Sequence, residues 1–120
     1  MGIMLANPIS MVGRETKIKK GVIIMNFGQA IEELKNGKRV SRTGWNGKGM
    51  FLYMTKGSIC YLDELKPETA NYLRAFYVDK GMDEVEICPH IDMKTADNKL
   101  VIGWLASQTD MLAEDWYIVG

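Results

Sequence analysis

Two tryptophans, Trp104 and Trp116, flank a run of small polar residues where a packed core would instead contain aliphatic side chains. Flat aromatic faces beside hydroxyl, amide and carboxylate groups suit a nucleoside or a sugar. We therefore predict a ligand site in this stretch, formed by Trp104, Ser107, Gln108, Thr109, Asp110 and Trp116. One of these two tryptophans should lie in the core and the other should line the pocket, but the sequence does not show which is which.

A second group of such residues lies on a glycine-rich segment and consists of Trp45, Asn46, Lys48, Met50 and Phe51. Trp45 can stack on an adenine, although it can also plug the edge of a sheet. Asn46 can contact a base edge or a ribose, or can simply serve turn geometry. Lys48 can bind a phosphate, although lone surface lysines are usually solvated. Because Met50 and Phe51 alternate on a predicted strand, only one of them should reach the pocket.

The two arginines nearest this segment, Arg39 and Arg42, are three positions apart on a predicted strand. Their side chains should point to opposite faces, so at most one of them enters a given pocket. Residues 107–109 open a predicted short helix, whose free N–H groups can hold an anion or take part in ordinary capping. Because the Asp110 carboxylate would compete for those donors, we expect ribose or base contacts there first and phosphate contacts second.

A cysteine and a histidine lie close together, Cys88 and His90, which invites a nucleophile or metal interpretation. Neighbouring strand positions hold side chains too rigidly for a dyad, and no third ligand stands at zinc spacing. A buried, hydrogen-bonded pair of His90 and Asp92 is the better hypothesis. We therefore expect no catalytic residues, no metal and no cofactor. For an enzyme, the candidates would be His90 with Asp92, or Asp110 with Asp115, and their spacing matches no known template.

The composition is that of one globular domain. The chain has 120 residues, 47% of them hydrophobic and 25% charged, with a formal net charge of zero. No global basic field exists to attract DNA or RNA, so an anionic ligand must be held by local groups. No apolar run approaches the roughly 20 residues of a membrane helix, and no signal peptide pattern is present. The two cysteines are too few for a disulfide framework, so we expect a cytoplasmic protein.

The elements that would position these residues indicate an α+β fold, with an N-terminal helix followed by a small antiparallel sheet with short helical insertions. Apolar spacing predicts a helix over 27–36, with Asn26 and Gln29 at its start and Gly37 after its end. A strand pattern marks residues 38–43, 50–55, 85–88, 91–95, 99–104 and 116–119. The Asn46-Gly47 pair predicts a tight reversal between the first two of these strands. A short helix is predicted over 107–114, with Ser107 and Asp110 as its capping pair. Residues 56–84, with helical segments at 61–65 and 67–77, read as an insertion between sheet elements.

The first 24 residues differ from the rest, because they are net basic and lack clear periodicity. We expect residues 1–24 to be an extension, a functional start at Met25, and a single ligand-binding domain over 25–120. The alternative is that residues 21–25 form a genuine first strand.

Four stretches, residues 25–30, 44–50, 89–97 and 101–116, together resemble the second type of Thoeris anti-defence protein, a small phage and prophage family. The resemblance covers residues 25–120. It implies a protein that binds and sequesters a cyclic ADP-ribose isomer (glycocyclic ADP-ribose), made by a TIR-domain enzyme, without cleaving it. It also implies a homotetramer built from two dimers, acting in the cytoplasm of an infected or lysogenic host. Some relatives hold CBASS cyclic dinucleotides at a separate site, which gives one alternative. An enzyme that hydrolyses the signal and a structural phage protein are the others.

Overall fold

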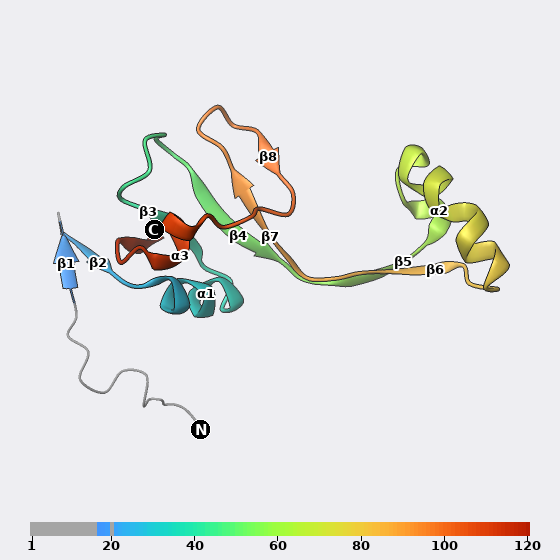
Figure 1. Cartoon of the computed structure of the whole chain (residues 1–120), viewed down its shortest axis with the longest axis horizontal. Coiled ribbons are helices and arrows are strands. Elements are labelled where there is room, and N and C mark those ends of the chain that lie inside the picture. Colours follow the sequence, from blue (N-terminus) through green and yellow to red (C-terminus); the bar gives the residue numbers. More distant parts are fainter. Residues whose placement is uncertain (1–16, 20) are drawn as a thin grey trace, which may run out of the picture.

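The computed structural model of the chain describes residues 17–19 and 21–120. The prediction of an extension over residues 1–24 therefore falls largely outside the described residues. The elements follow the chain as β1 (Lys17–Lys19), β2 (Val22–Ile24), α1 (Phe27–Lys35), β3 (Arg39–Arg42), β4 (Phe51–Thr55), β5 (Ser58–Tyr61), the 3-10 helix η2 (Leu62–Glu64), α2 (Pro67–Asp79), β6 (Glu84–Ile87), β7 (His90–Lys94), β8 (Leu100–Val101), α3 (Gln108–Leu112) and β9 (Trp116–Val119) (Figure 1). The mixture of helices with antiparallel strands confirms the predicted α+β class.

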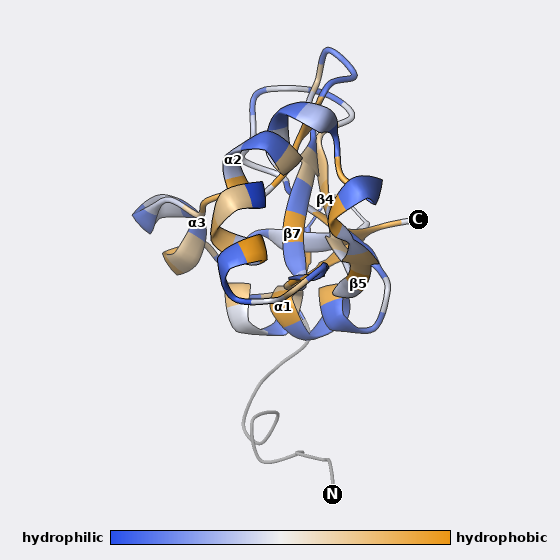
Figure 2. Cartoon of the chain, turned by 90° about the vertical axis from the view of Figure 1, so that its right-hand side faces the viewer, coloured by the Kyte–Doolittle hydropathy of each residue, from blue (hydrophilic) through white to orange (hydrophobic). Residues whose placement is uncertain are grey.

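The centre of the protein is a five-stranded antiparallel sheet in the order β8-β7-β4-β3-β9. β4 and β7 form its longest ladder, which runs from the pair Phe51 and Lys94 to the pair Thr55 and His90. Polar and apolar residues alternate along β7, as the hydropathy colours in Figure 2 show. Because neighbouring strand residues point to opposite faces, β7 turns Ile91 and Met93 toward the core and Asp92 and Lys94 to the other face of the sheet.

The apolar face of the sheet packs against α1. The core cluster consists of Ala30, Leu34, Val40, Leu52, Met93 and Trp116. Helix α1 turns Ala30 and Leu34 toward the sheet, and Asn26 caps its start in a capping box with Gln29, as predicted. Each of these six residues is at most 9% exposed.

The other face of the sheet carries Ser41, Phe51, Tyr53 and Tyr117, and no helix of the described part packs on it. We call it the open sheet face. Its residues alternate along their strands with the core residues Val40, Leu52 and Trp116.

Residues 56–89 form an arm that extends from the sheet, as Figure 1 shows. The β4–β7 hairpin continues into the paired strands β5 and β6, and α2 lies at the tip. The arm has its own small core of Leu62, Ala70 and Val85, separate from the core under α1. At the root of the arm, a Cβ on Gly57 would come within 2.9 Å of the Ile87 carbonyl oxygen, so only glycine fits there. The predicted insertion is confirmed, and it is a projecting structure with its own core.

The predicted order of elements is wrong at its beginning. The hairpin β1–β2 precedes α1, so the first helix is not N-terminal, and the fold contains more strand than expected. The strand considered as an alternative for 21–25 is present at Val22–Ile24. Met25 then joins the sheet edge through two backbone hydrogen bonds with Trp116, of 2.7 and 3.1 Å.

Three local predictions also differ from the structure. The residues Asn46 and Gly47 form no tight reversal. Instead, a long loop over residues 43–50 joins β3 to β4, in which Val40 pairs with Leu52. The start of this loop is held by a hydrogen bond from Gly44 N to Asp115. The strand expected over 99–104 is only Leu100–Val101, because Gly103 takes a φ of 80° and the chain turns back to β7. The helix expected over 61–65 is the single 3-10 turn η2. Among the described helices, none is long and apolar enough to cross a membrane.

Candidate functional site

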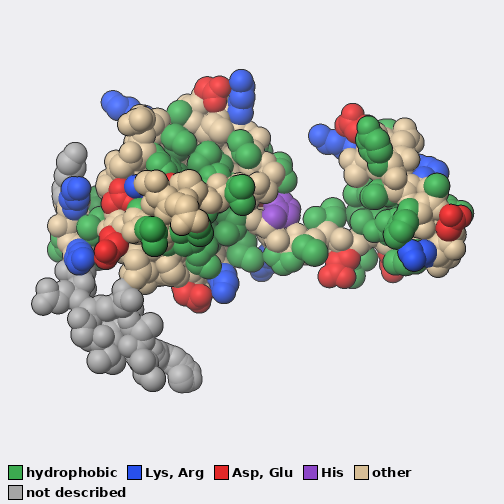
Figure 3. All heavy atoms as spheres, viewed as in Figure 1, with side chains coloured by type: hydrophobic (Ala, Val, Ile, Leu, Met, Phe, Trp, Pro, Cys, Tyr) green, Lys and Arg blue, Asp and Glu red, His purple; other side chains and the backbone are tan. Residues whose placement is uncertain are grey.

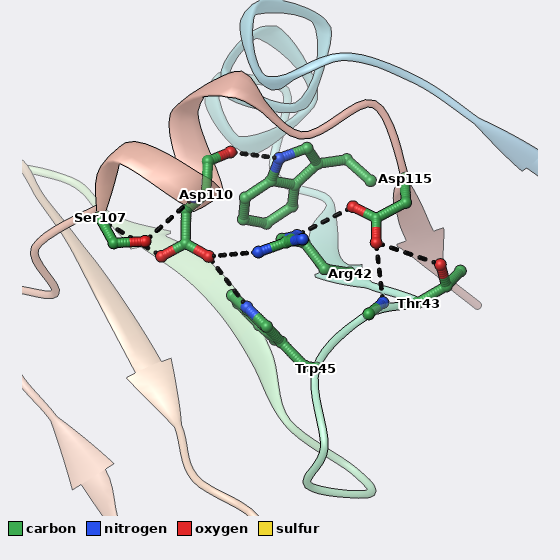
Figure 4. A network of polar contacts seen from close by, with 8 residues as sticks. Arg42, Thr43, Trp45, Ser107, Asp110 and Asp115 are labelled. Atoms are coloured by element: carbon green, nitrogen blue, oxygen red, sulfur yellow. Dashed lines mark hydrogen bonds and ion pairs between the residues drawn. The ribbon is translucent and has the colours of Figure 1, made fainter.

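Arg42 is at the centre of a polar network beneath the loop 43–50 (Figure 4). Its Nη1 donates to Asp110 Oδ1 at 2.7 Å, and its Nε donates to Asp115 Oδ1 at 2.8 Å. The three side chains are between 12% and 20% exposed. Charge-assisted bonds in such a sheltered place are stronger than surface pairs, so Arg42 ties β3 to both ends of the segment 110–115.

The same two carboxylates fix the start of the loop. Asp115 Oδ2 accepts hydrogen bonds from Gly44 N at 2.8 Å and Thr43 Oγ1 at 3.2 Å, and Asp110 Oδ1 accepts one from Trp45 Nε1 at 3.1 Å. A Cβ on Gly44 would stand 2.8 Å from Asp115 Oδ2, so this close approach requires glycine. The loop therefore leaves β3 in a defined direction.

Both carboxylates of the network are held ionised. Burial opposes ionisation of Asp110, but hydrogen bonds from Trp45, Arg42 and Ser107 outweigh it, so the pKa of Asp110 lies below its ordinary value. Burial likewise opposes ionisation of Asp115, and its bonds with Arg42 and Gly44 again lower the pKa below normal. The pKa of Arg42 is raised, chiefly by its hydrogen bond with Asp115. Neither carboxyl group is therefore placed to act as an acid near neutral pH.

Helix α3 begins with the predicted capping box of Ser107 and Asp110. Asp110 N donates to Ser107 Oγ at 3.0 Å, and Ser107 N donates to Asp110 Oδ2 at 3.1 Å. The Asp110 carboxylate thus accepts three hydrogen bonds from side chains and backbone of the protein itself. Gln108 and Thr109 are exposed on the first turn. Contact of these four residues with a ligand stays a prediction.

The three tryptophans form one cluster on the apolar side of the sheet. Trp45 meets Trp116 edge to face with ring centroids 5.3 Å apart, and Trp104 lies 6.2 Å from Trp45 and 6.3 Å from Trp116. Trp116 is completely buried, and its Nε1 donates to the Asp110 carbonyl oxygen at 3.0 Å. Trp116 is therefore the core tryptophan that the sequence left unassigned, while Trp104 is only partly buried.

A pocket of about 290 Å³ opens between the loop 43–50 and the open sheet face. It is lined by Ser41, Arg42, Thr43, Trp45, Gly47, Lys48, Gly49, Met50, Phe51, Tyr117 and Val119. Three aromatic residues, Trp45, Phe51 and Tyr117, thus line the same space as the polar residues Ser41, Thr43 and Lys48. This combination can hold a flat ring beside a group that forms hydrogen bonds.

The structure brings only part of the predicted site together. Four of the predicted residues line the pocket, namely Trp45, Lys48, Met50 and Phe51. The expectation that only one of Met50 and Phe51 reaches it is wrong, because Met50 precedes β4 and does not follow the strand's alternation. Trp45 is the tryptophan that lines this pocket, and neither Trp104 nor Trp116 is among the lining residues, so contact of the partly buried Trp104 with a ligand stays a prediction. Asn46 is exposed on the loop.

The other lining residues were not in the predicted site, namely Ser41, Arg42, Thr43, Gly47, Gly49, Tyr117 and Val119, although Arg42 had been considered as a cation near the loop. Alternation along the last strand would have placed Tyr117 and Val119 opposite the buried Trp116. Nothing in the sequence, however, shows that β9 pairs with β3, where Ser41 lies opposite Tyr117.

The predicted His90–Asp92 pair is confirmed at the root of the arm. His90 Nδ1 lies 2.6 Å from Asp92 Oδ1, and Asp92, 1% exposed, also accepts hydrogen bonds from Thr55 Oγ1 and Gly103 N. Burial opposes ionisation of Asp92, but these bonds outweigh it and lower its pKa. The pair joins the ends of β4 and β7 and contributes nothing to the lining of the pocket.

Fold and site together define a small α+β protein with an aromatic and polar pocket at one face of an antiparallel sheet. Residues 25–119 match the family model described as the Thoeris anti-defense 2-like domain. The chain is also 42% identical over 95 residues to "Thoeris anti-defense 2" of Bacillus phage SP01, an alignment that covers 79% of this chain and 94% of that protein. The chain belongs to the Thoeris anti-defence 2-like family.

Proposed function

We propose that the protein counters Thoeris immunity by binding and sequestering a TIR-generated cyclic ADP-ribose isomer, glycocyclic ADP-ribose, without cleaving it. Membership of the Thoeris anti-defence 2-like family supports an anti-defence role for a phage protein inside the host cell. The observation that carries the nucleotide proposal is the pocket lined by Trp45, Phe51 and Tyr117. Stacking of a base on an aromatic side chain typically contributes about 1–3 kcal/mol.

The size of the pocket suits part of such a ligand. About 290 Å³ is at the lower end of small-molecule sites, so it accommodates a nucleoside portion while the rest lies over the open sheet face. Among the lining residues, Tyr117 carries a phenolic hydroxyl that can bond ribose hydroxyls, and Lys48 carries a cation that can bond a phosphate. Trp45 is held by Asp110, so the pocket is preformed and costs little ordering on binding.

Sequestration fits these residues better than hydrolysis. A hydrolase needs a general base or a metal at the bond that breaks. The nearest carboxylates, Asp110 and Asp115, already accept bonds from Arg42, and their lowered pKa values make them poor proton carriers. His90 lies at the far end of β4 from Phe51. In the part of the chain that is described, no group of three potential ligands could hold a metal ion.

The proposal includes self-association, in line with the homotetramer that the family resemblance implies. Large apolar side chains are exposed on the arm, among them Ile59, Tyr61, Tyr72, Phe76 and Val78. Figure 3 shows hydrophobic side chains along the arm and at its tip. Exposed apolar clusters of this kind are typical of association surfaces. Light scattering coupled to gel filtration gives the mass in solution, and a monomer at micromolar concentration would contradict this part.

The experiment that tests the function is isothermal titration with glycocyclic ADP-ribose, followed by denaturation and chromatography of the released ligand. A sponge requires tight binding, and a Kd near 10 nM corresponds to about −11 kcal/mol. Tight binding with intact ligand recovered supports sequestration, whereas a cleaved product supports the enzyme. Titration with cyclic dinucleotides tests the alternative of a CBASS signal. No binding of either would favour a structural role.

A matched pair of variants ties the binding to the pocket. Tyr117→Leu removes an aromatic ring from the pocket wall and keeps an apolar side chain on β9. Leu105→Ala changes a residue that is 90% exposed and outside the pocket. We expect the first to weaken binding about 5- to 50-fold, as loss of a stacking partner does, and the second to leave it unchanged. Equal affinities for both would place the ligand elsewhere.

A further inference from the structure

Two basic side chains, Arg39 and Lys94, lie over the ring of Phe51, and a third, Lys48, lines the pocket that Phe51 also lines. Arg39, Lys48 and Lys94 form no ion pair within 4.0 Å among the described residues. Such pairs are formed by Lys17, Lys35, Arg42, Arg74 and Lys99. Cations that no Asp or Glu side chain pairs with give a chain of zero net charge a local positive field.

The phenyl ring of Phe51 organises two of these cations. The guanidinium carbon of Arg39 lies 5.0 Å from the ring centroid, and Lys94 Nζ lies 5.8 Å from it. Lys94 pairs with Phe51 across β4 and β7, and Arg39 comes from the neighbouring strand β3 on the same open sheet face. Cation–π contacts of this kind hold a charge in place without neutralising it.

Backbone oxygens complete the positioning. Lys94 Nζ donates to the Gly49 carbonyl oxygen at 2.9 Å, next to Lys48, which lines the pocket. Arg39 Nη2 donates to the Gly120 backbone oxygen at 2.9 Å. Gly49 has a φ of 74°, which favours glycine, and a Cβ there would stand 3.3 Å from Lys94 Nζ. Arg39 and Lys94 are therefore oriented by groups that leave further N–H donors of each side chain for a ligand.

The acidic residues in the neighbourhood are occupied. Asp97, whose negative charge feels Lys94, accepts a hydrogen bond from Thr95 Oγ1 at 2.6 Å and pairs with Lys99 at 3.3 Å. Asp115, on the other side of the loop, is bound by Arg42 and Gly44. The positive field over Phe51 consequently faces solvent and the mouth of the pocket.

We infer that Arg39, Lys48 and Lys94 form an anion subsite that binds the diphosphate of a nucleotide whose nucleoside portion occupies the pocket. The inference deepens the proposed function and rests on it for the position of the nucleoside. A diphosphate carries two negative charges over several oxygens, which matches separate cations at the rim better than one deep anion hole. The subsite makes the protein select diphosphate-containing nucleotides over uncharged nucleosides.

The test compares charge-removing variants at the subsite with one elsewhere. Arg39→Gln, Lys48→Gln and Lys94→Gln are each titrated with glycocyclic ADP-ribose and with inorganic pyrophosphate. Lys66→Gln, which removes a charge from an exposed lysine at the start of α2, is the control. We expect each subsite variant to lose about 5- to 20-fold in affinity for both probes, as single charge-assisted bonds at a partly exposed site do. The control and the melting temperatures should stay unchanged.

The outcomes separate the subsite from the proposed function. Tight binding of glycocyclic ADP-ribose that all three variants retain overturns the subsite and leaves sequestration standing. Pyrophosphate binding that depends on the three cations, without binding of the cyclic nucleotide, supports the subsite and overturns the function. Absence of binding of both probes overturns both.

Discussion

A single residue, Arg42, joins the pocket loop to the segment after α3. It lies on β3 next to Ser41, which faces the pocket, and its own charge is shared between Asp110 and Asp115. Sequence analysis placed Arg42 among the candidate ligand cations, together with Arg39 and Lys48, because these three lie nearest the glycine-rich segment. The two ion pairs give Arg42 a structural role, whereas Arg39 points to the open sheet face and pairs with no Asp or Glu side chain of the described residues.

Two substitutions on one strand distinguish these roles. Arg42→Gln leaves two largely buried carboxylates without their cation, so we expect a loss of about 2–4 kcal/mol in the free energy of unfolding, somewhat below that of a fully buried pair. Arg39→Gln makes the same chemical change on the opposite face, at an exposed residue, and should alter stability by less than about 0.5 kcal/mol. Urea denaturation followed by tryptophan fluorescence measures both. Equal stability of the two variants would show that the Arg42 network contributes little.

The ionised carboxylates also predict how stability depends on pH. Asp92, Asp110 and Asp115 have lowered pKa values in the folded protein, while an unfolded chain has Asp near about 3.9. Below that value the unfolded state binds more protons, so stability is complete above about pH 5 and is lost as pH falls through the folded pKa values. Denaturation at several pH values should show this loss, and Arg42→Gln should show a shallower one. A pH-independent free energy of unfolding between about pH 5 and 3 would contradict it.

At the scale of elements, local signals in the sequence predicted what local physics determines. The capping boxes at Asn26 and Ser107 mark the starts of α1 and α3, because cap geometry depends on neighbouring residues alone. The loop 43–50 was misjudged, since its course depends on Asp115, 71 residues away from Gly44. Pairing of β9 with β3 is likewise non-local, which is why Ser41 and Tyr117 were absent from the predicted site. The hairpin β1–β2 was hidden by its basic and irregular sequence.

The arm is the element whose independence is open to a direct test. Its apolar cluster shares no residue with the core under α1, and the arm leaves the sheet where Thr55 pairs with His90. Replacing residues 56–89 with Asn-Gly should therefore leave the body folded, with a melting temperature lower by no more than about 5 °C, close to 1 kcal/mol of stability. The same variant should lose self-association in light scattering. A shortened chain that fails to unfold cooperatively would mean that the body depends on the arm.

At the scale of the whole molecule, the total charge is zero, but the charges are unevenly distributed over the surface. The fifteen basic and fifteen acidic residues of the chain give a net charge of zero. Near the pocket, however, Asp110 and Asp115 pair with Arg42, whereas Arg39, Lys48 and Lys94 pair with no Asp or Glu side chain of the described residues. Ligand binding is therefore expected to depend on a local field rather than on net charge. Such a field acts over roughly one Debye length, about 10 Å at 0.1 M salt.

The salt dependence of ligand binding therefore distinguishes the contribution of the three cations at the rim from that of the aromatic pocket. We expect the Kd for glycocyclic ADP-ribose to rise about 3- to 10-fold between roughly 0.05 and 0.5 M sodium chloride, because exposed rim charges are screened whereas stacking is not. In Lys94→Gln the salt dependence should be smaller, since one of the screened charges is gone. In Tyr117→Leu it should stay that of the wild type, although binding is weaker throughout. A Kd that is independent of salt in the wild type would mean that the ligand is held by the pocket's aromatic and hydroxyl groups alone.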